Sequence, residues 1–165
     1  MLEKFKEWAN AGDGGVMYNL AVMYRTGEGV EQDLKESAYW LEKAANSKHI
    51  DAMKDFAAKL RTGSDFIEQN QEAAINLYKE VIELYRDEEA MENLLDMCSL
   101  GQGVPKNDSE TLNFLLNIIN RMHNNIYSPS IFFATLRHNE CTMDYLRAWE
   151  RRRIAKQTQR LLNEN

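Results

Sequence analysis

Apolar residues recur along the chain at helical spacing, in segments that short glycine-containing turns separate. The first stripe lies on one face of a helix and comprises Val16, Leu20, Ala21 and Tyr24. Gly27 follows where a helix commonly ends, because glycine adopts a positive φ at little cost. A second apolar stripe comprises Ala38, Leu41 and Ala45. The pattern therefore predicts a helix, a glycine turn and a second helix, with Asp33 as the N-cap of the second helix.

This helix–turn–helix unit repeats. Residues 16–27 recur at residues 52–63, an offset of 36, and both copies end in Arg-Thr-Gly. Residues 36–44 recur at 72–80 with the same offset, which places Phe66 at the position of Val30 and Asn76 at that of Trp40. A repeat of this length predicts a solenoid of stacked helix pairs.

A third copy begins near Glu88 and contains the turn Gly-Gln-Gly-Val at residues 101–104. Cys98 takes the place of Tyr24 in it, so we expect Cys98 to be a small buried apolar residue. Val30 and Val104 are expected to fill the corner between the two helices of their units, and Asn107 to cap the second helix.

We expect a single domain over residues 1–165, with repeats at about 11–47, 48–84 and 88–120. Residues 2–11 are expected to add half a unit before the first repeat, because Leu2, Phe5 and Trp8 share one helical face. A degenerate fourth helix pair and a C-terminal cap are expected within residues 128–165, where Trp149 takes the place of Trp40.

The repeats resemble those of the Sel-one-like repeat (SLR) family, a branch of the tetratricopeptide-repeat (TPR) superfamily, over about residues 10–120. The family pattern in the first repeat comprises Leu20, Ala21, Met23, Tyr24, Gly27, Gly29, Val30, Asp33, Ser37, Trp40, Ala44 and Ala45. The resemblance implies an all-α fold, a right-handed α-α superhelix of about three helix-turn-helix repeats with capping helices at both ends. It also implies a concave face lined mainly by first helices, and a role as an adaptor or scaffold that binds proteins or peptides.

The charge of the chain bears on its partners. The formal net charge is −6, and residues 137–165 carry +3, which leaves −9 on residues 1–136. An acidic body favours a basic protein partner and argues against nucleic acid or an anionic membrane surface. The cluster Arg151–Arg153 is interpreted as a solvated helix face.

No motif for chemistry stands out. A phosphate-binding loop follows a strand and carries Lys with Ser or Thr, whereas the Gly-Glu-Gly-Val turn at residues 27–30 follows a helix and lacks that sequence. The three histidines and two cysteines show no metal-ligand spacing, and the closest pair is His138 and Cys141. The acidic residues Asp87, Glu88 and Glu89 suit a helix N-terminus. We therefore expect no catalytic residue, no metal and no cofactor.

The sequence gives no sign of a secretory signal or of a membrane span, because no apolar run approaches about 18 residues. A cytoplasmic bacterial protein with reduced thiols is the resulting expectation, as a monomer or weak dimer.

The candidate binding surface is the side of the first helices that lies opposite the apolar stripe, at about 100° per residue. We call it the first-helix face. Its residues are Tyr18, Asn19, Val22 and Arg25 in the first repeat, Lys54, Asp55 and Arg61 in the second, and Glu92, Asn93 and Asp96 in the third. Mixed polar groups with an aromatic residue suit a groove that binds protein.

Two interpretations of function remain from the sequence. The first is a non-enzymatic protein–protein interaction module that grips a partner through its concave face. The alternative is a bacterial immunity protein that neutralises a cognate toxin or secreted effector. A hydrolase is a distant third.

Overall fold

The computed structural model describes residues 2–64, 66–105, 108, 110, 111, 113–115, 117 and 118. These residues form six helices: α1 (Leu2–Asn10), α2 (Gly14–Thr26), α3 (Leu34–Asn46), α4 (Ile50–Thr62), α5 (Gln71–Tyr85) and α6 (Glu88–Leu100). Helical residues follow between 110 and 118. The expected fourth helix pair, Asn107, Trp149 and the Arg151–Arg153 cluster lie outside the described residues.

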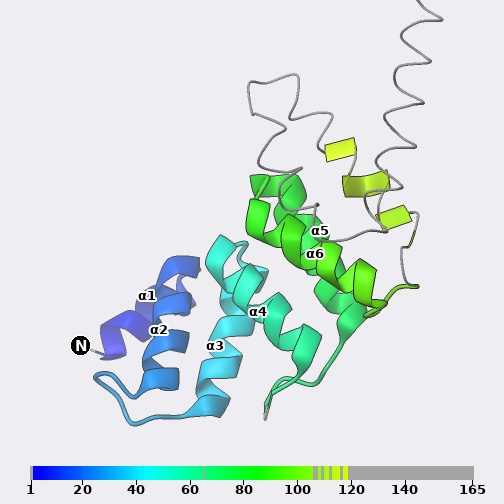
Figure 1. The fold of residues 1–165 in the computed structure, drawn as a ribbon. Coiled ribbons are helices and arrows are strands. Elements are labelled where there is room, and N and C mark those ends of the chain that lie inside the picture. The colour runs from blue at the N-terminus through cyan, green and yellow to red at the C-terminus, as the bar shows by residue number, and fades with distance from the viewer. Residues whose placement is uncertain are drawn as a thin grey trace, which may run out of the picture.

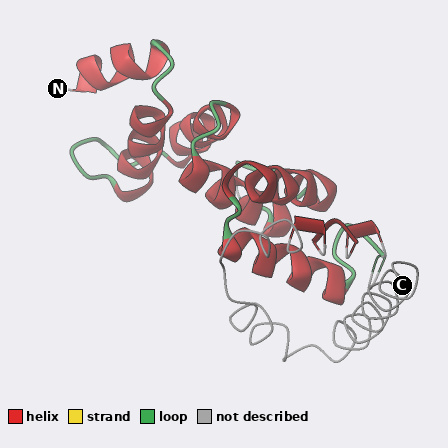
Figure 2. Ribbon diagram, turned by 90° about the horizontal axis from the view of Figure 1, so that it is seen from above, coloured by secondary structure: helices red, strands yellow, loops and turns green. Residues whose placement is uncertain are grey.

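Each helix packs against the next in chain order, from α1 with α2 to α5 with α6. The described helices form an elongated array with the N-terminus at one end (Figure 1). Seen from above, the helix pairs succeed one another along the array (Figure 2). The all-α solenoid expected from the repeats is therefore confirmed.

Capping explains where the helices begin and end. Asp13, His49 and Asp87 cap the first helices α2, α4 and α6, each by accepting a hydrogen bond from the backbone N–H three residues ahead. Asp33 caps α3, as expected, and accepts from the amides of Lys35 and Glu36 at 2.9 and 3.0 Å. The N-caps of the first helices are thus 36 and then 38 residues apart.

Gly27 ends α2 in the left-handed conformation, at φ 76° and ψ 16°, and its amide donates to the carbonyl of Met23. This confirms the expected C-terminal role of that glycine. The turns that lead into the first helices α2, α4 and α6 also contain a residue with positive φ, which sequence reasoning missed. These residues are Gly12, Lys48 and Arg86, at φ 102°, 66° and 55°.

The core runs the length of the array, and its apolar stripe is rotated slightly from the expected one. Leu20, Ala21 and Tyr24 are buried, but Met17 is buried in place of Val16, which is half-buried. Equivalent methionines are buried in the next two units, at Met53 and Met91. A buried methionine therefore recurs at this position of each repeat. Cys98 is also buried, as expected.

The turn of the second repeat contains one residue more than that of the first. Gln32 Nε2 donates to the carbonyl of Arg25 at 2.7 Å, and Gln69 Nε2 donates to that of Arg61 at 3.0 Å. The two arginines are 36 residues apart, whereas the two glutamines are 37 apart. The uninterrupted offset of 36 is therefore wrong beyond this turn.

The extra residue changes which side chain fills the corner. Ile67, not Phe66, takes the place of Val30: it is only 7% exposed, whereas Phe66 is 53% exposed. Leu77, not Asn76, occupies the position of Trp40. The corner itself remains filled in the three units, because Val30 and Val104 also pack against the core.

The expected N-terminal half-unit exists as α1, but its apolar face is only partly covered. Leu2 and Phe5 pack against the core, whereas Trp8 remains 53% exposed and contacts the ring of Phe5 at a centroid distance of 5.8 Å.

Candidate functional site

The first-helix face lies along α2, α4 and α6, and it is less exposed than its place opposite the apolar stripe suggests. Four of its ten residues are exposed, namely Asn19, Arg25, Glu92 and Asp96. The other six are half-buried, namely Tyr18, Val22, Lys54, Asp55, Arg61 and Asn93. Half-burial arises because several of these side chains reach across to the neighbouring repeat.

The first and second repeats are joined on this face at Asp55. The phenol of Tyr18 donates a hydrogen bond to Asp55 Oδ2 at 2.8 Å. Arg25 Nη1 lies 3.9 Å from the same carboxylate oxygen, as an ion pair. Two side chains of α2 thus converge on one acceptor of α4.

The second and third repeats are joined in an equivalent way. Arg61 lies 36 residues after Arg25, and Asn93 lies 38 residues after Asp55. Arg61 Nη1 donates to Asn93 Oδ1 at 3.4 Å, while its Nε donates to Gln102 Oε1 at 2.8 Å. A basic residue near the end of one first helix therefore reaches an acceptor in the middle of the next, twice in succession.

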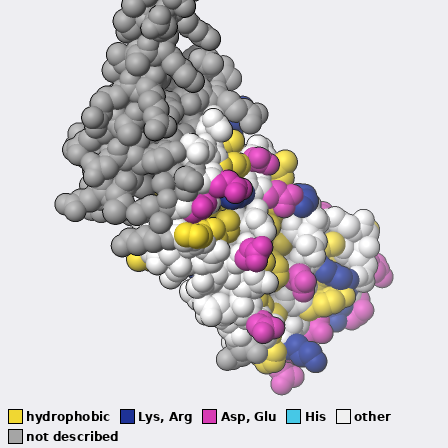
Figure 3. All heavy atoms as spheres, turned by 90° about the vertical axis from the view of Figure 1, so that its right-hand side faces the viewer, with side chains coloured by type: hydrophobic (Ala, Val, Ile, Leu, Met, Phe, Trp, Pro, Cys, Tyr) yellow, Lys and Arg dark blue, Asp and Glu magenta, His cyan; other side chains and the backbone are white. Residues whose placement is uncertain are grey.

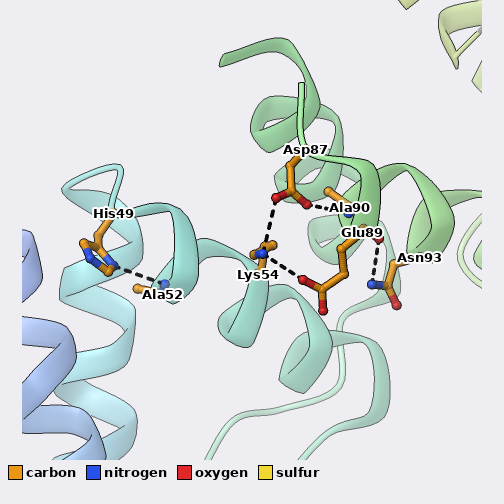
Figure 4. A network of polar contacts seen from close by, with 7 residues as sticks. All are labelled: His49, Ala52, Lys54, Asp87, Glu89, Ala90 and Asn93. Carbon is orange, nitrogen blue, oxygen red and sulfur yellow. Dashed lines mark hydrogen bonds and ion pairs between the residues drawn. The ribbon is translucent and has the colours of Figure 1, made fainter. Parts of the chain in front are cut away.

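Lys54 makes a second contact between these repeats. Its Nζ lies 3.3 Å from Asp87 Oδ2 and 2.7 Å from Glu89 Oε2, both at the N-terminus of α6. Figure 4 shows the lysine reaching from α4 towards these two carboxylates, while the other oxygen of Asp87 caps the helix at Ala90. The acidic residues expected only to favour the helix dipole thus also hold a neighbouring repeat.

Tyr18 makes the equivalent contact one repeat earlier, since Lys54 lies 36 residues after it. Its ring stacks on His49, the N-cap of α4, at a centroid distance of 5.2 Å and an interplanar angle of 27°. His49 Nδ1 accepts from the Ala52 amide at 3.4 Å, so its role here is to cap the helix. We call this series of contacts between successive first helices the inter-repeat row.

The environment of the row shifts two of its titrating groups. Burial, followed by the hydrogen bond to Asp55 and the negative charge of that carboxylate, together raise the pKa of the Tyr18 phenol to about 12. The hydrogen bond to Glu89 raises the pKa of the Lys54 ammonium, with a second contribution from Asp87. Both groups therefore keep their protons at neutral pH, and the row is in its hydrogen-bonding form.

Sequence reasoning named most of the row but missed its connections. It did not identify His49, Asp87, Glu89 or Gln102 as contact residues. The only available signal was the repeat itself: residues at equivalent offsets, such as Arg25 and Arg61, recur with acceptors at equivalent offsets in the next unit.

Acidic and basic side chains are interspersed with apolar ones on the side of the molecule shown in Figure 3. Within the described residues, no three His, Cys, Asp or Glu side chains gather as metal ligands. His138 and Cys141 lie outside those residues. The chemistry that the face offers is hydrogen bonding, charge and limited apolar contact.

Membrane insertion by a helix finds no support in the part of the chain that the structure describes, because none of its helices is both long and apolar enough to cross a bilayer.

Comparison with known proteins adds a family. The family model described as Sel1 repeat matches residues 16–49, 58–84 and 89–116. A search of curated proteins gave no match.

Two solved structures share the fold. A Sel1 repeat protein from Oxalobacter formigenes aligns with a TM-score of 0.61 and 21% identity, over 71% of this chain and 47% of that one. A protective antigen present in uropathogenic Escherichia coli strains, which displays an SLR fold, aligns with a TM-score of 0.59 and 22% identity, over 73% of this chain and 26% of its own. The chain thus spans about half the length of the first protein and about a quarter of the second.

Proposed function

Because the chain belongs to the Sel1 repeat family, whose model matches all three of its central repeats, we propose that it is a non-enzymatic module that binds another protein along the concave side of its first helices. Sel1 repeats generally serve protein–protein interaction. The bound segment would lie across α2, α4 and α6 and contact the exposed residues of the first-helix face.

The inter-repeat row is the observation that supports this proposal most strongly. It links α2 to α4 through Asp55, and α4 to α6 through Lys54 and Arg61. Side chains that are already held in place lose less conformational entropy when a partner binds. A surface built in this way favours a partner that presents a fixed pattern of donors and acceptors.

Charge favours a basic partner at the α6 end of the face. Glu92 and Asp96 are both exposed there, one helical turn apart, and the chain as a whole carries −6. Opposite charges would steer the encounter and speed association. Arg25 and Asn19, at the α2 end, would accept a less basic part of the same partner.

A dedicated inhibitor that occludes a toxin remains the second candidate, because the acidic α6 end of the same face would suit a basic toxin. Affinity distinguishes the two candidates. An adaptor for short peptides is expected to bind at about micromolar Kd, whereas an inhibitor binds a single partner at about nanomolar Kd or tighter.

The test is capture of the partner from the native cell with a tagged chain, followed by titration with surface variants. Asn19→Arg and Asp96→Arg change exposed residues of the face without removing a contact of the inter-repeat row. Glu83→Arg, on an exposed position of α5, makes the same change of charge as Asp96→Arg but on a second helix, and is the matched control.

Binding through the first-helix face predicts that Asn19→Arg and Asp96→Arg raise the Kd for the partner at least about tenfold, equivalent to about 1.4 kcal/mol, while Glu83→Arg does not. If the partner bound all three variants with equal affinity, the proposal would be contradicted.

A further inference from the structure

A small cavity of about 100 Å³ lies beside the turn between α4 and α5, in the second repeat. Its lining comes from the end of α2, the start of α3, the end of α4 and the turn that follows α4. The lining residues are Arg25, Leu34, Ser37, Ala38, Lys59, Ser64, Phe66 and Ile67. We call it the corner pocket.

The second turn, which contains the extra residue, contributes two neighbouring apolar side chains to the corner pocket. Ile67 turns into the core and forms part of the wall, while Phe66 stays 53% exposed beside it. Leu34, the first residue of α3, is 42% exposed across the same opening. Two exposed apolar side chains therefore border a pocket whose lining also includes Ala38 and Ile67, and exposed apolar residues that gather at one place mark contact sites.

The charge of the lining is opposite to that of the chain as a whole. Arg25 and Lys59 line the pocket, and none of the described lining residues is acidic. The Arg25 side chain is 45% exposed, and its ion pair with Asp55 is long, at 3.9 Å. Lys59 forms no ion pair with any residue that the structure describes. Two cations are thus available for an anionic ligand.

The size of the cavity limits what can occupy it. Pockets for small molecules and cofactors measure about 300–1,000 Å³, several times this volume. A cavity of about 150 Å³ lined by apolar residues accommodates a single benzene ring. The corner pocket therefore has room for one aliphatic side chain.

The polar groups around the pocket are largely satisfied within the chain. The Ser37 hydroxyl donates to the Ala21 carbonyl at 2.7 Å, and the Ser64 amide donates to the Ile67 carbonyl at 2.9 Å. A ligand would therefore be held by apolar contact inside the pocket and by the two cations at its edge.

We propose that the corner pocket binds an acidic peptide segment of another protein, which inserts one aliphatic side chain between Leu34 and Phe66 and places its carboxylates against Lys59 and Arg25. This site shares Arg25 with the first-helix face, but Leu34, Lys59 and Phe66 do not belong to that face, and of the lining residues only Lys59 and Phe66 are varied in the test below. The two proposals can therefore fail independently.

The probe is a short synthetic peptide with blocked ends, in which one leucine is flanked on each side by two acidic residues. Its binding to the full chain is measured by fluorescence anisotropy, beside two matched peptides. One has serine in place of the leucine, and the other has lysine in place of every acidic residue. The protein variants are Lys59→Glu and Phe66→Ser, with Asp96→Arg as the control for a change on the first-helix face.

The proposal predicts that the acidic leucine peptide binds at about micromolar Kd and that both matched peptides bind at least about tenfold more weakly. Lys59→Glu and Phe66→Ser are each expected to raise the Kd for the acidic leucine peptide at least about tenfold, while Asp96→Arg leaves this Kd unchanged. Circular dichroism of each variant confirms that the helices are intact.

Absence of binding by the acidic leucine peptide would overturn the proposal. If the serine peptide bound equally well, insertion of an aliphatic side chain would be contradicted. If the lysine peptide bound more tightly, the contact of carboxylates with Lys59 and Arg25 would be contradicted. Sedimentation of the protein alone tests whether a second copy of this chain occupies the pocket. A dimer that Phe66→Ser dissociates would show such an occupant and would likewise overturn the proposal.

Discussion

The phenol of Tyr18 donates a 2.8 Å hydrogen bond to the carboxylate of Asp55, from the first helix of one repeat to the first helix of the next. Both residues lie on a side that a helical wheel assigns to solvent. This hydrogen bond links the two first helices. Titration of the Tyr18 phenol therefore reports whether the link is intact.

We predict that Tyr18→Phe makes the stability of the protein less sensitive to alkaline pH. In the unfolded chain the phenol loses its proton near pH 10, whereas in the folded protein the pKa of Tyr18 is raised to about 12. The unfolded state therefore binds fewer protons than the folded state between about pH 10 and 12, and the free energy of unfolding falls as pH rises through this window. Urea unfolding across that range measures the slope.

At neutral pH the free energy of unfolding of Tyr18→Phe is expected to be about 1 kcal/mol lower than that of the wild type, because the half-buried carboxylate of Asp55 loses a hydrogen-bond donor. Tyr39→Phe, which changes a tyrosine that is 47% exposed on α3, is the matched control. A slope between pH 10 and 12 that is the same for the wild type and Tyr18→Phe would contradict the prediction.

Truncation of Ile67 is expected to destabilise the protein far more than truncation of its neighbour. Ile67 is 7% exposed and packs in the core, so Ile67→Ala should cost about 2–3 kcal/mol. Phe66→Ala, at a half-exposed position, should change stability by less than about 1 kcal/mol. Chemical denaturation of both variants tests the position of the extra residue, and the reverse order would restore Phe66 to the place of Val30.

Two glycine turns that look alike in sequence should tolerate alanine differently. Gly27 has φ +76°, and the Cβ of an alanine would approach no atom closer than 3.4 Å, so Gly27→Ala should cost about 1 kcal/mol of backbone strain. Gly103 has the same φ, but an alanine Cβ would lie 2.8 Å from the backbone carbon of Gln71. Gly103→Ala should therefore cost about 2–4 kcal/mol, and equal thermal midpoints for the two variants would refute this difference.

Arg86→Gly is expected to stabilise the protein. Arg86 adopts φ +55° at an exposed position between α5 and α6, where a side chain carries strain that glycine lacks. We expect a gain of about 0.5–1 kcal/mol in the free energy of unfolding, with Arg86→Ala close to the wild type because it keeps the Cβ. No gain with glycine relative to alanine would argue against strain at this position.

The sequence was sufficient for the helices, the first glycine turn and much of the core. Leu20, Gly27 and Cys98 lie where the repeat pattern places them, because local spacing and glycine chemistry act within a few residues. Met17 was missed in favour of Val16, since neighbouring positions differ by only 100° on the helix and both fall near the edge of a broad apolar arc.

The contacts of the inter-repeat row could not be predicted from single helices. A first helix in this array has neighbours in its own repeat and in the next, and the contact with the next repeat is largely polar. Lys54 and Asp87 therefore look like ordinary surface residues in a helical wheel, although they meet at 3.3 Å.

The extra residue in the second turn escaped notice for another reason. Alignment without a gap places an apolar residue, Phe66, at the position of Val30, so nothing in the pattern demands an insertion. The equivalent hydrogen bonds of Gln32 and Gln69, 37 residues apart, and the burial of Ile67 in place of Phe66 reveal it.

Site-specific photo-crosslinking in the native cell tests the central claim, binding of a protein along the first-helix face, most directly. A photoreactive amino acid is introduced singly at Asn19 or Asp96, on α2 and α6, and at Glu42 or Glu83, on exposed positions of α3 and α5. The account predicts that positions 19 and 96 crosslink to one and the same protein, while positions 42 and 83 do not. Crosslinks to that protein from positions 42 and 83 alone would contradict it.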